Sequence, residues 1–556
     1  MTSTGETKPG DTSRPSGNGR ILALTVCSAG IGGTFQYGYN ISIINAPTSY
    51  IQSFINNTYM ERWGTGLDIP QVTVLWTLIV SAFSLGGLIG ALLAGPMAVH
   101  CGRKNSLLVN NVFLFVGAVL VLTCRVAKSF EMVILARILV GINSGVSMNI
   151  QPMYFGESAP THLRGAVAFS SAVFTAFGIF LGQVVGLTEL LGSEPLWTYL
   201  LASNTLPGLI QLLTLPWFPE SPRYLLIDRG DREACLHALG RLRGGEAPVL
   251  EMEELCREQQ QQLVNNRPGA ASKTPWSLFK DRELRSQLRI VMFASSAMML
   301  CGNDSIYFYA SYIFLEAGIP SDKVQYAAIG TGASELIASI LSNLLIERMG
   351  RRYLLLGGYS LMSCWSIVFT IALILQSRGV AGMPYLSIVC VYAYILSFGL
   401  GPAGVTGILP AEIFDQGARP AAYMIAGSFM WLSLFLVGML FPFIVNGLGN
   451  FCFLPFLVVC LISAVFLGYS VPETKGKTLA EITSEFQRKR DTKKSKPGKQ
   501  EDGTVENHYQ LGAASSFTSL KQYPGLNPMN EDRNLINSSE RENESDHAFG
   551  VIESTL

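Results

Sequence analysis

The segment "CGRKNSLL" at residues 101–108 recurs in altered form as "MGRRYLLL" at residues 349–356. Two more pairs of segments follow in the same order, "GESAPTHLRGAVA" (156–168) with "AEIFDQGARPAAY" (411–423) and "PESPR" (219–223) with "PETKG" (472–476). The members of each pair lie roughly 250 residues apart, and similarity at a near-constant spacing is the signature of a repeated structural unit. The sequence therefore predicts two halves with the same fold.

Apolar runs long enough to cross a membrane lie on both sides of a polar central stretch. Hydrophobic residues make up 49% of the chain and charged residues only 14%, whereas soluble domains carry about 25% charged residues. A spanning helix needs about 20 mostly apolar residues. Such runs occur near 21–44, 72–95, 107–125, 131–154, 166–190 and 198–218, and then near 285–313, 324–346, 353–375, 384–410, 421–446 and 451–471. We expect an all-α membrane protein with twelve transmembrane helices in two parallel six-helix halves.

The chain is expected to comprise five segments. Its central stretch is charged and spaces its apolar residues as a helix does, which predicts a cytoplasmic helical linker. The C-terminal stretch is polar and lacks a sizeable apolar run, which is typical of disorder. The expected segments are a cytoplasmic N-terminal tail (1–20), a six-helix bundle (21–218), the linker (219–284), a second six-helix bundle (285–471) and a disordered cytoplasmic tail (472–556).

The distribution of Lys and Arg among the short loops predicts the orientation in the membrane, because cytoplasmic loops are enriched in both. The richer side includes the "GRK" and "GRR" loops, and it places both termini and the linker in the cytoplasm. The loop at 45–70 is then extracellular, and it carries the glycosylation sequon "NNT" at Asn56. We expect a multi-pass protein of the plasma membrane, with an endosomal pool left open.

Acidic and basic residues gather at the predicted cytoplasmic helix ends, where they can pair across the two halves. Such pairs would break and re-form as the halves rock against each other. The alternative is that the arginines only satisfy the positive-inside bias. The predicted salt-bridge network consists of Arg103, Glu157, Arg164, Glu220, Arg223, Glu347, Arg351, Arg352, Glu412, Arg419 and Glu473.

Six segments together resemble one transporter family over roughly residues 20–480: "GRK", "PMYFGESAPTHLRG", "PESPRYLL", "ERMGRR", "AEIFDQGARPAA" and "PETKGKT". They are similar to the sugar-porter branch of the major facilitators, whose fold has two parallel six-helix halves. More narrowly, they resemble the facilitative hexose transporters, in particular the fructose-transporting second class. The resemblance implies passive movement of glucose or fructose by alternating access.

The resemblance also implies the site residues. The family's sugar-binding asparagines of the seventh and eighth helices fall on Asp304 and Glu335. The aromatic gate of the seventh helix falls on Phe308 and Tyr309, and Tyr309 and Tyr37 are further candidates for sugar contact. The family's broken tenth helix, expected to act as a hinge, falls on Gly401, Pro402, Gly404 and Gly407.

Several of the family's sugar contacts are missing from this chain. A glutamine of the fifth helix is replaced by Ala172, and a pair of glutamines in the seventh helix is replaced by Met298 and Met299. The tryptophan of the tenth helix is replaced by Gly407. These replacements imply fewer contacts to glucose and a roomier pocket, which fits fructose use.

Asp304 lies within an apolar run, where an aspartate costs about 2.5–3.5 kcal/mol at a helix centre. Three interpretations stay open for Asp304 and Glu335. The carboxyls bind sugar hydroxyls, or they titrate in proton coupling, or they hold helices together through neighbours such as Ser305 and Thr331. Coupling is disfavoured because proton-driven relatives carry an aspartate where this chain has Asn40.

Other classes of function have little support in the sequence. The five histidines show no metal-ligand spacing and no nucleophile–base pattern is present, so neither an enzyme, a metal site nor a cofactor is expected. A net charge of zero gives no sign of nucleic-acid binding. The expected partners are a hexose and membrane lipid.

The main rival is a sugar sensor of the same fold that does not transport. The tail carries "YPGL" (523–526), which resembles a sorting motif for an endocytic adaptor, and "STL" at the C-terminus, which resembles a PDZ ligand. An organic acid as cargo is disfavoured, because two carboxylates would repel it.

Overall fold

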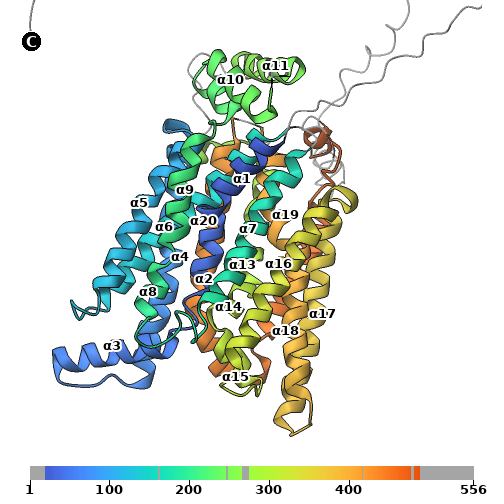
Figure 1. The fold of residues 1–556 in the computed structure, drawn as a ribbon. Helices are drawn as coiled ribbons and strands as arrows, with labels where there is room; N and C mark the ends of the chain where they lie inside the picture. The colour runs from blue at the N-terminus through green and yellow to red at the C-terminus, as the bar shows by residue number, and fades with distance from the viewer. Residues whose placement is uncertain are drawn as a thin grey trace, which may run out of the picture. The chain divides into compact units, whose positions relative to one another are not determined.

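The computed structural model describes residues 19–160, 163–245, 248–265, 274–282, 284–415, 417–477, 481–486 and 488. They form helices joined by short turns (Figure 1). The helices before the central linker are α1 (Arg20–Ile31), α2 (Thr34–Ser42), α3 (Thr48–Trp63), α4 (Ile69–His100), α5 (Arg103–Thr123), α6 (Glu131–Ser158), α7 (Arg164–Val185), α8 (Trp197–Ala202) and α9 (Thr205–Thr214).

The linker and the second part of the chain follow the same pattern. The linker holds α10 (Arg232–Arg243), α11 (Val249–Asn265) and α12 (Pro275–Lys280). The later helices are α13 (Arg285–Leu300), α14 (Asn303–Phe308), α15 (Ala310–Glu316), α16 (Val324–Met349), α17 (Arg351–Ser377), α18 (Met383–Leu400), α19 (Pro402–Ile413), α20 (Arg419–Leu448) and α21 (Leu454–Ser470).

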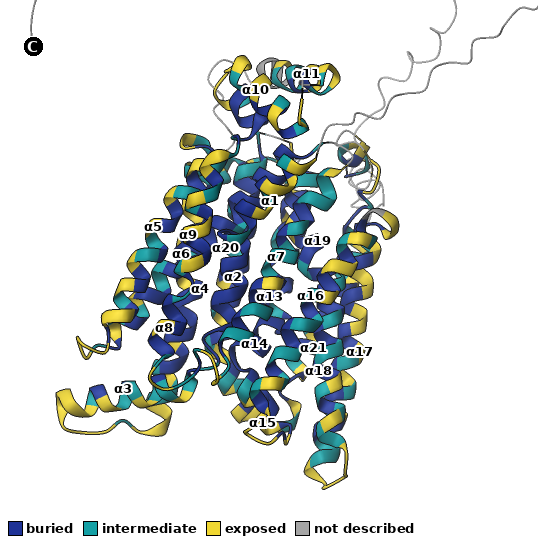
Figure 2. Ribbon diagram, viewed as in Figure 1, coloured by how far each residue is buried: buried dark blue, intermediate teal, exposed yellow. Residues whose placement is uncertain are grey.

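The helices account for twelve membrane crossings. Eight spans are long and apolar enough by themselves, with α18 and α19 counted together as one. The other four are α21 and three crossings that consist of consecutive shorter helices, namely α1 with α2, α8 with α9, and α13 with α14 and α15. Large apolar side chains such as Leu92, Val112 and Leu461 are exposed, as a surface in contact with lipid requires. Figure 2 shows exposed residues along helices such as α5 and α17.

Among the described residues, four crossings are divided into consecutive helices, and three of the breaks concern the helices around the cavity. The tenth crossing breaks between Leu400 and Pro402, as the sequence predicts. A break also separates α1 from α2, and another separates α13 from α14 at Gly302, which has a φ of 82°. Glycine adopts this left-handed conformation without steric cost. The predicted span near 285–313 therefore consists of three consecutive helices, and Asp304 lies in the first turn of α14.

The "GRK" segment forms a tight turn that the rest of its half holds in place. Gly102 has φ 90° and ψ 175°, a conformation that is essentially restricted to glycine. Directly after it, the backbone N–H groups of Arg103 and Lys104 donate to the Glu220 carboxylate at 2.9–3.1 Å. The "PES" segment thus has a structural role toward "GRK", because Glu220 caps the helix that begins at Arg103.

The second half repeats this arrangement. Gly350 has φ 89° and ψ 162°, and the N–H groups of Arg351 and Arg352 donate to Glu473 at 2.9 and 3.1 Å. The segments that repeat in the sequence therefore form the same set of hydrogen bonds in both halves.

Helices of the two parts pack against each other in pairs. α4 contacts α20, α7 contacts α16, and α2 contacts α14. These contacts bring residues far apart in the sequence together around the centre of the bundle.

The described part of the C-terminal tail differs from the expectation of disorder from residue 472. Residues 481–486 are helical, and Ile482 and Phe486 are 2% and 7% exposed. Their spacing of four residues places both on one face of a helical turn, where they can pack on the protein. The motifs at 523–526 and at the C-terminus lie outside the described residues.

We predict that Gly102→Ala and Gly350→Ala each destabilise the protein by about 1–3 kcal/mol, the typical cost of this backbone conformation for other residues. A Cβ would also lie 2.7 Å from Glu220 at the first position and 2.6 Å from Glu473 at the second. Thermal unfolding in detergent checks this. Gly357→Ala in α17 is the control, because its Cβ meets no atom within 4 Å. Equal stability of all three variants would contradict the prediction.

Candidate functional site

A cavity lies at the centre of the bundle and is lined by residues from both parts of the chain. Its volume is about 60 Å³, several times the roughly 10–15 Å³ that one water molecule needs. The lining residues of the first part are Thr34, Tyr37, Met148, Pro152, Ala168, Phe169, Ser171, Ala172, Thr175 and Ile179, and those of the second are Met298, Asp304, Glu335, Phe398, Ala403, Gly404, Gly407 and Ile408.

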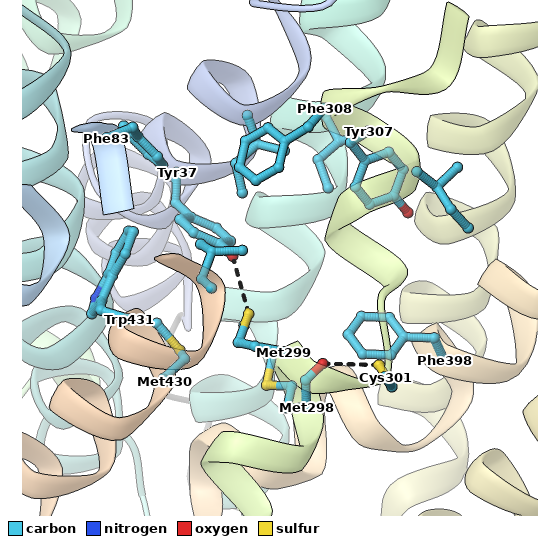
Figure 3. Packing of buried hydrophobic residues seen from close by; sticks show 14 of the residues in the cluster. Tyr37, Phe83, Met298, Met299, Cys301, Tyr307, Phe308, Phe398, Met430 and Trp431 are labelled. Atoms are coloured by element: carbon cyan, nitrogen blue, oxygen red, sulfur yellow. Dashed lines mark hydrogen bonds between the residues drawn. The ribbon is translucent and has the colours of Figure 1, made fainter. Parts of the chain in front are cut away.

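Asp304 is buried on this cavity and is bonded across the two parts of the chain. The hydroxyl of Tyr37, from α2, donates to Asp304 Oδ2 at 3.2 Å. The same hydroxyl lies 3.8 Å from the Met299 sulfur, as Figure 3 shows. The Tyr37 ring is held edge-on to Trp431 at 5.4 Å between centroids, and it also packs on Phe83. The Tyr37–Asp304 hydrogen bond therefore joins the first and second parts of the chain beside the cavity.

Glu335 is the second carboxyl on the cavity, and its partners come from α14. It hydrogen-bonds the Tyr307 hydroxyl, and Asn303 Nδ2 donates to the same carboxylate oxygen at 3.5 Å. The partners expected from the sequence, Ser305 and Thr331, are not the ones found. Thr331 instead accepts a bond from Gln183 of α7 at 2.8 Å, which links the two parts a second time.

The opposite wall carries hydroxyl groups that the sequence analysis did not single out. Thr34 Oγ1 donates to the carbonyl of Ser171 at 2.9 Å, and Thr175 Oγ1 donates to the same carbonyl at 3.1 Å. Gln151 accepts from the Thr34 N–H at 2.6 Å and so satisfies the backbone at the start of α2. These residues could have been found in the sequence as polar residues within otherwise apolar spans.

Two of the predicted site residues lie outside the cavity. Tyr309 donates to the Gly438 carbonyl at 2.8 Å and stacks on Phe441 with centroids 5.2 Å apart. The break after Gly302 and the altered backbone at Tyr309 (φ −125°) turn this side chain toward α20. Phe308 is buried beside it. Tyr309 therefore packs against α20 in this arrangement, and sugar contact through it stays a prediction.

The predicted hinge residues surround the break in the tenth crossing. Gly401 and Pro402 form the break itself, whereas Gly404 and Gly407 line the cavity. A Cβ on Gly404 would lie 1.9 Å from the Phe169 ring of α7, so only glycine permits this approach.

Asn40 does not reach the cavity lining. Its side chain donates to the Gln36 carbonyl at 2.8 Å and accepts from Asn204 at 2.9 Å. Arg137, a buried cation that the sequence analysis missed, donates to the Asn40 carbonyl at 3.0 Å and lies 4.6 Å from the centroid of the Phe83 ring. The neutral Asn40 amide is thus tied to its own part of the chain.

Arg103 is the centre of a charge cluster at one end of the bundle. Its Nε lies 2.9 Å from Glu157 and its Nη1 lies 2.7 Å from Asp228, a residue absent from the predicted network. The Arg103 and Glu157 side chains are 2% exposed, and that of Asp228 is 33% exposed. Burial raises the pKa of Asp228, and this outweighs the opposite effect of Arg103. Glu157 contacts Arg103 through Nε and Nη2 and is as deeply buried as Arg103, so we take it as the main partner.

The second part of the chain repeats this cluster. Arg351 lies 2.8 Å from Glu412, and Thr474 donates to the other Glu412 oxygen at 2.6 Å. The pairs Arg103–Glu157 and Arg351–Glu412 each join two helices of the same half. These two pairs therefore lie within a half, and pairing across the halves stays a prediction for the network as a whole. The reason for pairing within a half is geometric, because each arginine follows a glycine turn that places it beside the end of a neighbouring helix of its own half.

The linker supplies further acidic partners. Arg223 Nη2 lies 2.9 Å from Glu258 of α11. Arg164 lies near Arg223, with Glu251 and Glu258 as the opposite charges that act on it. The linker therefore neutralises part of the basic cluster.

Arg419 provides an interaction between the halves. It donates to the Ala411 carbonyl at 3.0 Å, and its charge also acts on Glu157 of the first half. Of the remaining predicted members, Glu220 and Glu473 bind backbone N–H groups and Arg352 takes part through its own N–H. The Glu347 side chain lies outside the described residues.

The predicted glycosylation site lies on α3. Asn56 is half-buried, and its side-chain oxygen accepts from the Leu67 N–H at 2.9 Å. Glycosylation at this position stays a prediction.

Comparison with known proteins places this geometry in context. Residues 25–486 match the family described as sugar (and other) transporter. The chain is 58% identical to the human solute carrier family 2, facilitated glucose transporter member 11, over 84% of this chain and 94% of that protein. It is 43% identical to the mouse facilitated glucose transporter member 5, over 87% of this chain and 95% of that protein.

Solved structures show the same fold. The proton:xylose symporter XylE bound to 6-bromo-6-deoxy-D-glucose matches with a TM-score of 0.70 at 22% identity, over 84% of this chain and all of that chain. A partially occluded inward-open XylE from E. coli matches with a TM-score of 0.67 at 23% identity, over 83% of this chain and 99% of that chain. The expected twelve-helix major facilitator fold is thereby confirmed.

We predict a measurable coupling between Tyr37 and Asp304. Tyr37→Phe and Asp304→Asn each alter the same bond, so the double variant is expected to lose less stability than the sum of the two, by about 0.5–3 kcal/mol. Thermal unfolding of the four proteins gives this coupling energy. Tyr39→Phe is the control, because its hydroxyl bonds Ser203 within the first half. Additive losses for Tyr37 and Asp304 would contradict the assigned bond.

We also predict unequal effects at the two partners of Arg103. Glu157→Gln is expected to cost about 3 kcal/mol, because it leaves a buried cation without its main partner. Asp228→Asn is expected to cost less than about 1 kcal/mol, because the Asp228 side chain is 33% exposed and a partly exposed ion pair contributes little to stability. Unfolding in detergent measures both, and the reverse order would show that Asp228 is the principal partner.

Proposed function

Because this chain belongs to the sugar transporter family, we propose that it moves hexoses passively across a membrane by alternating access of the central cavity. The observation that supports this proposal best is the cavity itself, whose polar groups come from both halves. A substrate held by both halves can pass from one side to the other when the halves rock. The relatives are transporters and not enzymes.

In this proposal Asp304 and Glu335 bind the sugar hydroxyls. A carboxylate accepts hydrogen bonds from hydroxyls more strongly than a neutral acceptor does. Hydroxyls of Thr34, Ser171 and Thr175 face the cavity from the other half. A sugar ring carries hydroxyls around its edge, so it can bond both walls at once.

Glucose and fructose are the proposed substrates. Ala172, Met298 and Gly407 line the cavity where the family's resemblance implied larger or more polar groups. A Cβ on Gly407 would meet no atom within 4 Å, so there is open space beside α19. This space supports the use of fructose.

Uniport is favoured over proton coupling. The side chain of Asn40, at the position where proton-driven relatives are expected to carry an acid, is engaged by neutral Gln36 and Asn204. An amide cannot exchange a proton in the physiological range.

The halves proposed to rock are residues 21–218 and 285–471, joined by the linker at 219–284. Gly401 and Pro402 act as the hinge, and Phe308 packs at the gate. The ion pairs of Arg103 and Arg351 hold helix ends together within each half, and Arg419 is proposed to act between the halves at the cytoplasmic end. We further propose a plasma-membrane location with both termini in the cytoplasm, since the positively charged "GRK" and "GRR" turns lie at one end of the bundle.

The test is uptake of labelled fructose and glucose by the purified full-length protein in liposomes at two pH values. We expect saturable entry that equilibrates without concentrating the sugar and does not depend on a proton gradient. Accumulation driven by an imposed proton gradient would overturn uniport. Binding without uptake would favour the sensor.

Asp304→Asn is predicted to keep transport and to change the ratio of fructose to glucose uptake. Exchanging one hydrogen-bond partner changes the binding free energy of a sugar by about 1 kcal/mol, so the ratio of fructose to glucose uptake should shift about fivefold. Asp322→Asn is the matched control, because Asp322 is exposed outside the cavity. An unchanged ratio in a folded Asp304→Asn protein would assign Asp304 a structural role.

A further inference from the structure

We propose that a group of hydrogen bonds at the outer end of the bundle acts as a latch between the two halves and holds the external path to the cavity closed. The latch consists of Thr188 and Glu189, which follow α7, and of Gln325 and Tyr326 in the first turn of α16. The inference rests on the proposed function and concerns the regulation of the same cavity.

The latch lies at the end of the bundle away from the charge clusters of Arg103 and Arg351. α7 begins at Arg164, whose charged neighbours belong to these clusters, and α16 ends at the Gly350 turn. The residues that follow α7 and those that begin α16 therefore lie at the opposite end. This end is extracellular in the proposed orientation.

The hydrogen bonds of the latch cross from the first half to the second. The Tyr326 hydroxyl donates to Glu189 Oε1 at 2.6 Å. Beside this bond, the backbone N–H of Thr188 donates to Gln325 Oε1 at 3.2 Å. The Thr188 hydroxyl lies 3.1 Å from the same Gln325 oxygen and 3.3 Å from Glu189 Oε2. Two adjacent residues of one half are thus bonded to two adjacent residues of the other.

These bonds are the outermost contacts of a series that runs from the cavity along α7 and α16. Ile179 of α7 and Glu335 of α16 line the cavity. Farther out, Gln183 of α7 donates to Thr331 of α16 at 2.8 Å. Tyr326 lies about 14 Å beyond Glu335 along α16, at about 1.5 Å per residue. A route from the cavity to the outside between these two helices therefore has to break the latch.

The segment that carries Thr188 and Glu189 is a compact turn. The N–H groups of Leu190 and Gly192 both donate to the Leu187 carbonyl, at 3.0 and 2.9 Å. The turn thus holds the two latch residues in place by its own hydrogen bonds. Such preorganisation lowers the entropy that is lost when a contact closes.

The latch is exposed, so it biases the position of the halves without locking them. Thr188 and Glu189 are exposed, and Tyr326 is 52% exposed. Water competes for both partners of an exposed polar contact, and such a contact therefore changes an equilibrium only severalfold. We expect that loss of the Tyr326–Glu189 bond raises the fraction of outward-open protein about threefold.

A contact at the same end of the bundle offers a matched control. Arg62 of α3 lies 2.6 Å from Glu131, which begins α6. The distance equals that between Tyr326 and Glu189, and the Glu131 carboxylate is also exposed. Both partners belong to the first half, so Glu131→Ala removes an exposed carboxylate without touching the contact between the halves.

The experiment measures how often the cavity opens to the outside. Ala172→Cys places a thiol on the cavity wall, where none of the described lining residues is a cysteine. A membrane-impermeant thiol reagent is added to intact cells that contain the full-length protein, and modification at position 172 is followed by mass spectrometry. The cavity of about 60 Å³ is too small to admit such a reagent while it is closed, so the rate of modification reports the outward-open fraction.

The latch variants are compared in the Ala172→Cys protein. Glu189→Ala and Tyr326→Phe are each expected to raise the rate constant of modification from outside about threefold. The double variant should show no further increase, because both changes remove the same bond. Glu131→Ala should leave the rate constant unchanged. A rate constant does not depend on how much of each protein the cells contain.

The outcomes separate the latch from the proposed function. An unchanged rate constant in both latch variants would overturn the latch. An equal increase in Glu131→Ala would overturn it as well, because loss of any external carboxylate would then have the same effect. Uptake of labelled fructose is measured in the same cells. Faster modification in the latch variants without saturable hexose uptake by the wild-type protein would support the latch and contradict the proposed function.

Discussion

A polar group inside a bilayer has to find its partner within the protein, and the arrangement of this fold follows from that constraint. Lipid offers no hydrogen bonds, so irregular backbone at membrane depth is tolerated only where it is buried or lines a cavity. The breaks at Gly302 and Gly401 lie beside the central cavity, and the start of α2 is satisfied by Gln151. Unpaired backbone groups at such breaks would be costly in contact with lipid. Here the break at Gly302 is followed by Asp304, which lines the cavity.

The same constraint explains the two ends of the molecule. Glu220 and Glu473 cap the helices that follow the glycine turns, and each does so through backbone N–H groups. The side chain of Arg103 pairs with Glu157 of the first half, and that of Arg351 pairs with Glu412 of the second half. These interactions join helices within each half, whereas the bonds Tyr37–Asp304 and Gln183–Thr331 cross between the halves near the cavity. Such a division suits two bodies that move against each other around a fixed site.

Much of this could be predicted from the sequence, because the signals were local or repeated. The repeat indicated two halves, the apolar runs indicated the spans, and a carboxylate in an apolar run marked Asp304 as a site residue. The break at Gly302 was missed because its apolar run is uninterrupted. Tyr309 was assigned to the site by resemblance, but the break affects where its side chain points, which is toward Gly438 of α20. The partners of Arg103 were also beyond reach, because pairing within a half or across halves depends on how helix ends meet in space.

The account holds that a hexose lies between the two carboxyls of the second half and the hydroxyl wall of the first. The most direct measurement is a structure of the full-length protein with fructose bound. The account predicts sugar oxygens about 3 Å from Asp304 or Glu335, with the ring also in contact with the α7 wall. A sugar bound elsewhere, with both carboxyls still held only by Tyr37, Tyr307 and Asn303, would contradict it.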